Sequence, residues 1–394
     1  MVGKITYIDE VDLTNKKIFM RVDFNVSLSK KDNSIKDDTR IKQTLPTLKF
    51  LLGENNRLIL SAHLGKPKGR DPLFSLGMVA KRLQEYLPNY KVILVNDFLT
   101  DKEVFEKQTP KEILLLENIR FYPEEKKNDP EFAKKLAALG EVYVNDGFGV
   151  SHREAASVVG VTQYIPSYGG LLLKKEVQMI LKSIENPQRP VVAIIGGAKI
   201  STKIGLIKKL MIVTDSVLIG GAMANTLMAA QGLEIGKSLS EAEFINEAKT
   251  LVEEGKKNGK LITPTDVICG NMEDQTTPGV VKNINELTKE DCILDIGPET
   301  VKKFQEIIAG AKTIIWNGPV GLFENPIYAK GTDAVYEAVV ANEGVTSVVG
   351  GGDTLTAIAK KDKNDRISHI STGGGAMLEL IEKGTLPGLE ALKK

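Results

Sequence analysis

Short apolar runs alternate with amphipathic stretches along most of the chain. Ten mainly apolar runs predict strands, and they cover residues 17–24, 57–62, 91–97, 113–118, 141–148, 191–197, 216–221, 260–268, 313–318 and 347–352. Residues 75–87, 129–140 and 241–257 carry apolar side chains at helical spacing. Strands that alternate with helices indicate parallel sheets built from βα units, so the fold class is α/β.

A helical connector divides this pattern into two halves. Pro166 and the pair Gly169–Gly170 precede one long helix, predicted over 171–184, and Pro187 and Pro190 follow it. The strands are too many for one comfortable sheet. We therefore predict two doubly wound, Rossmann-like domains joined by a helix.

The predicted domain bounds follow from these breakers. The N-terminal domain takes residues 1–170, the connecting helix 171–186 and the C-terminal domain 187–379. The last residues, 380–394, form a tail too short to be a domain, and we expect it to pack back onto the protein.

Composition narrows the class of protein. The 394 residues suggest two or three domains of about 150 residues each. The 52 Lys and Arg nearly balance the 51 Asp and Glu, which argues against a nucleic-acid or membrane binder. No segment resembles a signal peptide or reaches the length of a membrane span. The 2 cysteines show no metal-binding spacing, so a reduced cytoplasmic compartment is expected.

Glycine-rich strand ends in the second half indicate a nucleotide. They are "IIGGAK" (196–197), "LIGGAMAN" (220–221), "VVGGGDT" (350–352) and "STGGGAM" (373–375). Glycine lets the backbone approach a phosphate closely, and the helix that follows offers free N–H groups. Close packing of strand and helix is the alternative explanation for any one pair. The dinucleotide pattern G-x-G-x-x-G is absent, and "GLEIGKS" is one residue short of a P-loop.

Charged residues accompany these turns. Lys199 and Lys203 lie four apart, so one helix face can direct both ammonium groups at phosphate oxygens, although a solvated face is the alternative. Asp353 suits Mg²⁺ bridged to phosphates, since Mg²⁺ takes one or two protein carboxylates. A helix cap is the other role for Asp353, and Thr354 could share it. Glu324 could accept hydrogen bonds from ribose hydroxyls.

Arginine is scarce, with 9 among the 52 basic residues, and seven of the nine fall within the first 153 residues. Arg21, Asp23 and Asn25 alternate at a strand end and share one face. Arg40 lies in the first turn of a predicted helix, where a cation opposes the helix dipole. A residue that breaks a local rule in this way indicates a functional site.

Further basic residues follow other strands of the first half, namely His63, Lys66, Arg120, His152 and Arg153. Because strand ends gather at one edge of a parallel sheet, we expect these groups to converge there and to bind a small, multiply anionic molecule. The three histidines lie in separate motifs without zinc-site spacing. The sequence contains no G-x-S-x-G motif, so acyl transfer by a serine nucleophile is not predicted.

Together these stretches resemble the phosphoglycerate kinase family. The motifs "RVDFNV", "DDTRI", "AHLGKP", "LLLENIRF", "NDGFGVSHR", "GGAKISTKI", "DIGP", "WNGPVGLFE", "GGGDT" and "STGGGA" occur in the family's order over nearly the whole chain. The resemblance implies two lobes joined by a helix, with the tail returning to the N-terminal lobe. It also implies a monomeric cytoplasmic enzyme of glycolysis that moves a phosphoryl group between 1,3-bisphosphoglycerate and ADP with Mg²⁺.

The resemblance also assigns site residues. For 3-phosphoglycerate they are Asp23, Asn25, Arg40, His63, Lys66, Arg120 and Arg153. For the nucleotide they are Gly197, Ala198, Lys203, Gly220, Gly221, Asn317, Pro319, Gly321, Glu324, Gly351, Gly352, Asp353 and Thr354, with Asp353 on the metal. Around the phosphoryl group in flight they are Arg40, Lys199, Lys203 and the helix starts at Gly352 and Gly375.

Four positions depart from the family pattern. They are Ser27 for proline, Lys66 for arginine, Ala155 for a second histidine and Thr202 for aspartate. Lysine lacks the fork of arginine, so a bidentate phosphate contact is not expected at Lys66. None of the four changes removes a group on which the chemistry depends.

Two other function classes share this architecture. An NAD-dependent dehydrogenase would need the missing G-x-G-x-x-G, and a non-catalytic nucleotide-binding protein would have no use for the basic edge. Substrates held on two lobes must meet, so we expect hinge closure about the helix at 171–184.

Overall fold

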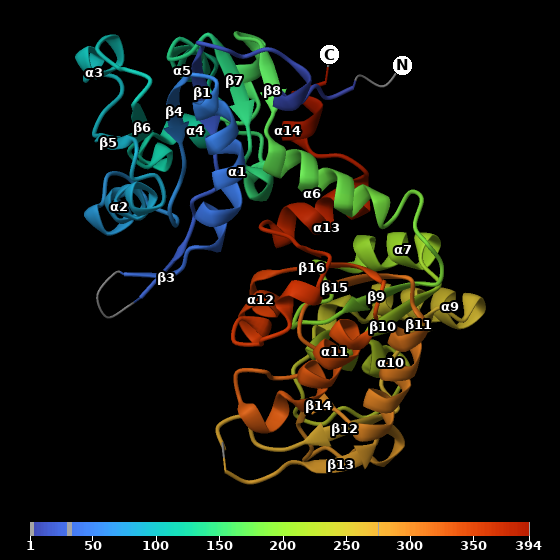
Figure 1. Ribbon diagram of the computed structural model, residues 1–394. Helices are drawn as coiled ribbons and strands as arrows, with labels where there is room; N and C mark the ends of the chain where they lie inside the picture. The colour runs from blue at the N-terminus through green and yellow to red at the C-terminus, as the bar shows by residue number, and fades with distance from the viewer. Residues whose placement is uncertain (1–3, 30–33, 275, 394) are drawn as a thin grey trace. The chain divides into compact units, whose positions relative to one another are not determined.

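The computed structural model describes residues 4–29, 34–274 and 276–393 (Figure 1). The chain divides into two compact units. Unit 1 is Met1–Gln178 with Thr385–Lys394, and unit 2 is Met179–Gly384. The boundary falls inside α6 (Leu171–Lys182), at the predicted connecting helix. The assignment of functions to domains at 1–170, 171–186 and 187–379 stays a prediction.

Unit 1 is built on a parallel sheet of six strands, in the order β5-β6-β4-β1-β7-β8. The strands are β1 (Lys17–Arg21), β4 (Arg57–Ser61), β5 (Lys91–Val95), β6 (Glu112–Leu116), β7 (Val142–Asn145) and β8 (Ser167–Gly169). The central strands are buried on both faces, which explains their continuous apolar runs. The chain order reverses on either side of β1, so the carboxyl ends of β1 and β7 form a topological switch point.

Helices cover this sheet, and α1 carries Arg40, a predicted site residue, in its first turn. They are α1 (Thr39–Gly53), α2 (Gly77–Tyr86), α3 (Lys102–Glu106), α4 (Pro123–Lys126), α5 (Pro130–Ala137) and α14 (Pro387–Glu390). Ile41, Leu48 and Leu51 of α1 are fully buried in the core of the unit. A short antiparallel pair, β2 (Ser27–Leu28) and β3 (Ile35–Asp37), precedes α1. Because this buried face packs on the sheet, the position of the first turn of α1, which contains Arg40, is fixed.

The C-terminal tail packs on unit 1. Gly388 N donates to Ser151 O over 2.8 Å, and a β-bridge pairs Ile5 with Lys393. Leu389 and Leu392 are buried, and Figure 1 shows α14, in red, beside β8. The predicted return of the tail to the N-terminal part of the chain is confirmed.

Unit 2 is built on a second parallel sheet of six strands, in the order β11-β10-β9-β15-β16-β17. The strands are β9 (Val191–Ile195), β10 (Ser216–Ile219), β11 (Leu261–Ile262), β15 (Thr313–Asn317), β16 (Thr346–Gly350) and β17 (His369–Ile370). The order is that of a dinucleotide-binding fold, with its switch point between β9 and β15. The predicted α/β class with two doubly wound parallel sheets is confirmed.

Seven α-helices lie wholly in unit 2 among the described residues: α7 (Ile204–Val213), α8 (Ala222–Ala230), α9 (Ile245–Asn258), α10 (Pro298–Gly310), α11 (Lys330–Ala341), α12 (Gly352–Ile358) and α13 (Gly374–Lys383). Among the helices that the structure describes in the whole chain, none combines the length and apolar character of a bilayer span.

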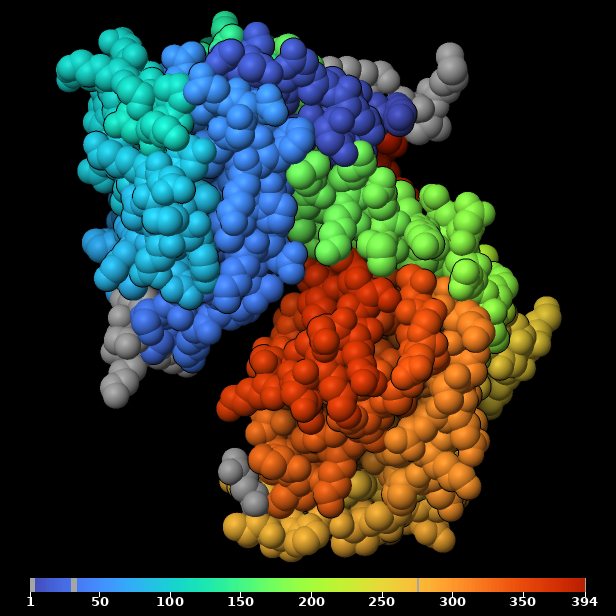
Figure 2. All heavy atoms as spheres, viewed as in Figure 1, coloured from blue at the N-terminus to red at the C-terminus, as the bar shows by residue number. Residues whose placement is uncertain are grey.

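One predicted strand differs from the structure. The run at 260–268 splits into β11 in the parallel sheet and β12 (Asp266–Cys269) in a separate antiparallel sheet with β13 (Val280–Asn283) and β14 (Ile293–Ile296). The break contains Pro264, which has no N–H for a sheet ladder. Figure 2 shows this region, in yellow to light orange, at one end of unit 2.

Candidate active site

Arg40 is held at the start of α1 by the end of the first strand segment. Its Nη1 donates to Asp23 Oδ1 and to Asn25 O, both over 3.1 Å, and lies 3.0 Å from Asp23 Oδ2. Asn25 in turn accepts from Gly65 N through its side chain, over 2.8 Å. All side-chain hydrogen bonds of Arg40 to the described residues use Nη1, so Nε and Nη2 make none there. The pair with Asp23 offsets the unfavourable helix dipole and leaves a donor face for an anion.

His63 is buried beside arginines and is neutral. Arg21 Nη2 lies 3.2 Å from His63 Nδ1. A guanidinium only donates, so Nδ1 accepts and the ring proton sits on Nε2. Burial, followed by the charges of Arg21, Arg120, Arg153 and Arg40, holds the pKa of His63 well below its usual value. His63 therefore offers one neutral N–H donor, Nε2, at pH 7.

Arg120 shows that the cations of this edge crowd one another. Its Nη1 donates to Gly65 O over 2.6 Å. Burial and the charges of Arg153 and Arg21 lower the pKa of Arg120 to about 10. A cavity of about 270 Å³ beside it is lined by the cations Arg21, Arg120, Lys126 and Arg153 and by the carboxylates Glu125 and Glu154. The cations exceed the carboxylates, so an anion at this edge would relieve their repulsion.

The seven residues predicted for the phosphoglycerate follow strands of one sheet. They come after β1 (Asp23, Asn25, Arg40), β4 (His63, Lys66), β6 (Arg120) and β7 (Arg153). Lys66 and Arg153 are exposed at this edge. Arg21 is not among the site residues predicted from the sequence, yet this buried arginine orients His63. The alternation of Arg21 with Asp23 and Asn25 was the signal that could have included it.

Unit 2 contains a largely apolar cavity of about 170 Å³. Seven residues predicted for the nucleotide line it: Gly197, Ala198, Gly221, Pro319, Gly321, Glu324 and Asp353. Its apolar walls include Met228, Leu239, Pro264, Val267, Met272 and Ile293, which the sequence did not single out. These side chains come from α8, from loops and from the antiparallel sheet, so no local motif could have revealed them. A cavity with apolar walls and a few polar groups suits a flat aromatic base that carries polar substituents.

The glycines of "GGGDT" and "STGGGA" serve two different purposes. Gly351 has φ +107°, and a Cβ there would lie 2.7 Å from Asn317 Nδ2. A Cβ on Gly374 would lie 2.4 Å from Gly351 Cα, so these two turns pack backbone against backbone. Gly352 and Gly375 differ, because a Cβ on either would meet no atom within 4 Å and neither has a positive φ. Packing therefore does not demand glycine at Gly352 or Gly375, whereas close approach of a ligand would.

Lys203 is anchored between three strand ends. Its Nζ donates to Gly196 O over 2.6 Å and to Asn317 Oδ1 over 3.1 Å. Asn317 Nδ2 donates to Gly350 O over 2.8 Å, so the amide and the lysine together link the ends of β9, β15 and β16. Burial lowers the pKa of Lys203 to about 8, although the charge of Asp353 opposes this shift. Asn317 thus positions the lysine from beside the cavity.

Three further predicted residues are placed as follows. Lys199 is exposed in the turn before α7. A Cβ on Gly220 would lie 2.4 Å from Val320 Cβ, so packing explains that glycine. Thr354 Oγ1 accepts from Gly318 N over 2.7 Å, and no side chain caps α12. The cap alternative for Asp353 and Thr354 is therefore wrong.

Asp353 fits a metal ion that is shared with a ligand. It is exposed in the first turn of α12 and lines the same cavity as Glu324. Within residues 4–29, 34–274 and 276–393, no three His, Cys, Asp or Glu side chains are grouped to hold a metal. Mg²⁺ needs no such cage, since it takes one or two carboxylates together with substrate phosphates.

Comparison with known proteins agrees with this geometry. Residues 8–384 match the family described as "Phosphoglycerate kinase". The phosphoglycerate kinase of Dictyoglomus turgidum is 46% identical over 396 residues, which cover 99% of this chain and 99% of the relative. "Phosphoglycerate kinase 3, cytosolic" of Arabidopsis thaliana is 46% identical over 389 residues, which cover 97% and 96%. The solved phosphoglycerate kinase of Coxiella burnetii has a TM-score of 0.88 at 37% identity and covers 99% of both chains. The chain belongs to the phosphoglycerate kinase family.

Proposed function

We propose that this protein catalyses the reversible, Mg²⁺-dependent transfer of a phosphoryl group from 1,3-bisphosphoglycerate to ADP, giving ATP and 3-phosphoglycerate in glycolysis. The observation that carries the proposal is the presence, in one chain, of a cation-rich strand edge in unit 1 and a nucleotide-like cavity in unit 2. Either feature alone would fit other functions. Their combination fits a kinase with an anionic acceptor.

In unit 1 the cationic edge would bind the phosphoglycerate. Arg120 and Arg153 would take the 3-phosphate, together with Lys66 as a point charge. His63 would donate Nε2–H to the same molecule, because Arg21 occupies its Nδ1. Asp23 and Asn25 hold the donor face of Arg40 in place through Nη1.

In unit 2 the apolar walls would take the base, and Glu324 the ribose hydroxyls. The N–H groups that open α12 and α13, at Gly352 and Gly375, would approach the phosphates without a Cβ between them. Asp353 would hold the magnesium ion. When bound, Mg²⁺ would supply positive charge that bridges and neutralises the phosphate oxygens.

Direct in-line transfer demands little covalent chemistry from the protein. The acyl phosphate leaves behind a weakly basic carboxylate, and the attacking ADP oxygen is already ionised, so no general base is needed. Arg40, Lys199 and Lys203 would neutralise charge on the equatorial oxygens of the moving group. The anchored positions of Arg40 and Lys203 would supply the alignment that such a transfer requires.

The two substrates would sit on different units, so transfer requires the units to close about α6. Small-angle scattering with both substrates should therefore show a smaller radius of gyration than with either alone, and an unchanged radius would contradict closure. We also propose that the enzyme is a cytoplasmic monomer. Relatives from Arabidopsis thaliana and Triticum aestivum carry "cytosolic" in their names, which supports the compartment.

A coupled assay tests the proposed function. With 3-phosphoglycerate and MgATP, and glyceraldehyde-3-phosphate dehydrogenase to consume the product, NADH oxidation should depend on both substrates. Binding of nucleotide without turnover would favour a non-catalytic nucleotide-binding protein. Thermal protection by NAD in the absence of turnover would favour a dehydrogenase.

A further inference from the structure

Lys199 and Lys203 project from a turn that its own residues hold weakly. This segment, residues 199–203, is called the lysine turn below. Thr202 Oγ1 donates to Lys199 O over 3.2 Å, and Lys203 N donates to Ile200 O over 2.8 Å. Lys203 is the N-cap of α7, but no side chain caps that helix. The Lys203 ammonium is anchored on Gly196 O and Asn317 Oδ1, outside the turn, but the backbone that carries Lys199 needs a further support.

Glu241 supplies that support from 40 residues away. Its Oε2 accepts from Ser201 N over 2.9 Å, and its Oε1 accepts from Ser201 Oγ over 2.7 Å. The backbone N–H of Ile200 also favours the ionised form of this carboxylate. Glu241 precedes the short helix Ala242–Phe244 but does not cap it, so its side chain is committed to the lysine turn.

The charge of this carboxylate is maintained by its surroundings. Partial burial disfavours the ionised form. The hydrogen bonds from Ser201 and Ile200 and the charge of Lys199 outweigh it, and they hold the pKa of Glu241 below its usual value. Both oxygens are therefore acceptors at neutral pH, as the two contacts with Ser201 require.

The segment that carries Glu241 also forms part of the nucleotide cavity. Leu239 and Asn225 line the cavity, and Asn225 Nδ2 donates to Leu239 O over 3.0 Å. Glu241 N donates to Thr226 Oγ1 over 3.0 Å, and Thr226 is fully buried on α8. Residues 239–241 thus contact both the cavity wall and the lysine turn, and α8 anchors them.

We propose that Glu241 is a positioning residue for phosphoryl transfer, which fixes the lysine turn relative to the nucleotide cavity through Ser201. The proposal rests on the proposed function, because it assigns Lys199 and Lys203 to the moving phosphoryl group. Glu241 itself touches no reacting atom. It acts by holding the backbone of the lysine turn at a fixed distance from a nucleotide whose base contacts the same segment, while Asn317 holds the Lys203 ammonium.

Three variants separate this role from a general effect on folding. Glu241→Ala removes both hydrogen bonds to Ser201, and kcat should fall about 10- to 100-fold, because small misplacements of catalytic groups cost this much. The KM for MgATP should stay within about threefold, since the cavity wall is intact. Glu241→Gln should keep kcat within about threefold. Its amide oxygen can accept from Ser201 N, and its N–H can donate to Ser201 Oγ, because a hydroxyl both donates and accepts. Glu243→Ala, at an exposed position two residues on, is the matched control and should behave as wild type.

Hydrogen exchange tests the same contacts without any activity. In Glu241→Ala the amides of Ile200 and Ser201 should exchange at least about tenfold faster than in wild type, while the Gln and control variants should match wild type. Unchanged exchange in Glu241→Ala would overturn the contact, and faster exchange with unchanged kcat would overturn the positioning role. Wild-type protein in the coupled assay decides the proposed function separately. If it is inactive with 3-phosphoglycerate, that function fails and this role for Glu241 fails with it, whatever the exchange data show.

Discussion

Replacement of Arg40 by alanine tests the cationic edge most sharply. Arg40 commits Nη1 to Asp23 and Asn25 and keeps Nε and Nη2 for a ligand. Loss of one preorganised donor to developing charge costs about 3–4 kcal/mol of barrier, which corresponds to about 10²- to 10³-fold in kcat. Nucleotide affinity should hardly change, because the nucleotide cavity belongs to unit 2.

The same change also affects stability, and this effect must be separated from catalysis. Asp23 is only 4% exposed and would lose its arginine partner, which costs about 1–3 kcal/mol. A drop of about 2–4 °C in Tm is expected for each kcal/mol. The double variant Asp23→Asn with Arg40→Ala removes the unpaired carboxylate charge of Asp23. It should therefore be more stable than Arg40→Ala but should not recover turnover.

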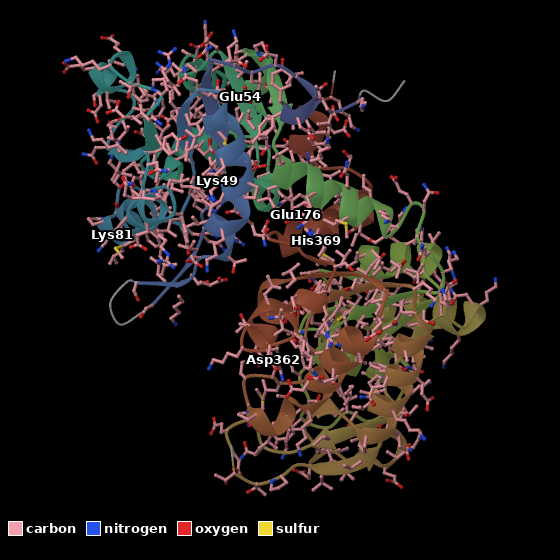
Figure 3. The ribbon with its side chains drawn as sticks, in the orientation of Figure 1. Lys49, Glu54, Lys81, Glu176, Asp362 and His369 are labelled. Atoms are coloured by element: carbon pink, nitrogen blue, oxygen red, sulfur yellow. The ribbon has the colours of Figure 1, made fainter. Side chains whose placement is uncertain are left out.

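The measurement is the coupled assay at saturating substrates, corrected for the folded fraction by circular dichroism. Lys49→Ala is the matched control, since Lys49 is exposed on the same helix, α1 (Figure 3). A kcat for Arg40→Ala within about threefold of the Lys49→Ala value would refute the assigned role of Arg40.

Three further predictions concern unit 2. If Asp353 is a Mg²⁺ ligand, Asp353→Asn should raise the KM for MgATP at least about tenfold. The control Asp362→Asn, at an exposed position after α12 (Figure 3), should leave it unchanged. Equal KM values for the two variants in steady-state kinetics would contradict the metal role. Gly375→Ala should keep its Tm but lose at least about tenfold in kcat, whereas Gly351→Ala should lower Tm because of its positive φ; a fully active Gly375→Ala would remove its assigned role. As pH rises through about 8, Lys203 should lose its charge and kcat/KM for MgATP should fall, but not in Lys203→Arg; a wild-type profile that is flat well above this pH would contradict the assignment.

The sequence predicted the parallel sheets well because their buried strands read as continuous apolar runs. The same reasoning failed at 260–268, where Pro264 separates β11 from a strand of a different sheet. Apolar periodicity cannot distinguish one long strand from two short ones here, because the residues on both sides of Pro264 have the apolar character of a strand.

The motifs at strand ends led to the two candidate sites, but not to the side chains that support them. Arg21 and Glu241 act on His63 and on the lysine turn through contacts across 42 and 40 residues. No local spacing encodes such contacts. The glycine motifs were likewise ambiguous, because only coordinates distinguish Gly351, which packing requires, from Gly352, which it does not.

The most direct test of the account is a crystal structure of the wild-type protein with 3-phosphoglycerate and a non-hydrolysable MgATP analogue. We expect the phosphoglycerate against Arg40, His63 and Arg120, and the γ-phosphate of the analogue against the backbone N–H groups at Gly352 and Gly375, with the metal on Asp353. A phosphoglycerate bound away from Arg40, or a triphosphate that leaves these two turns empty, would contradict it.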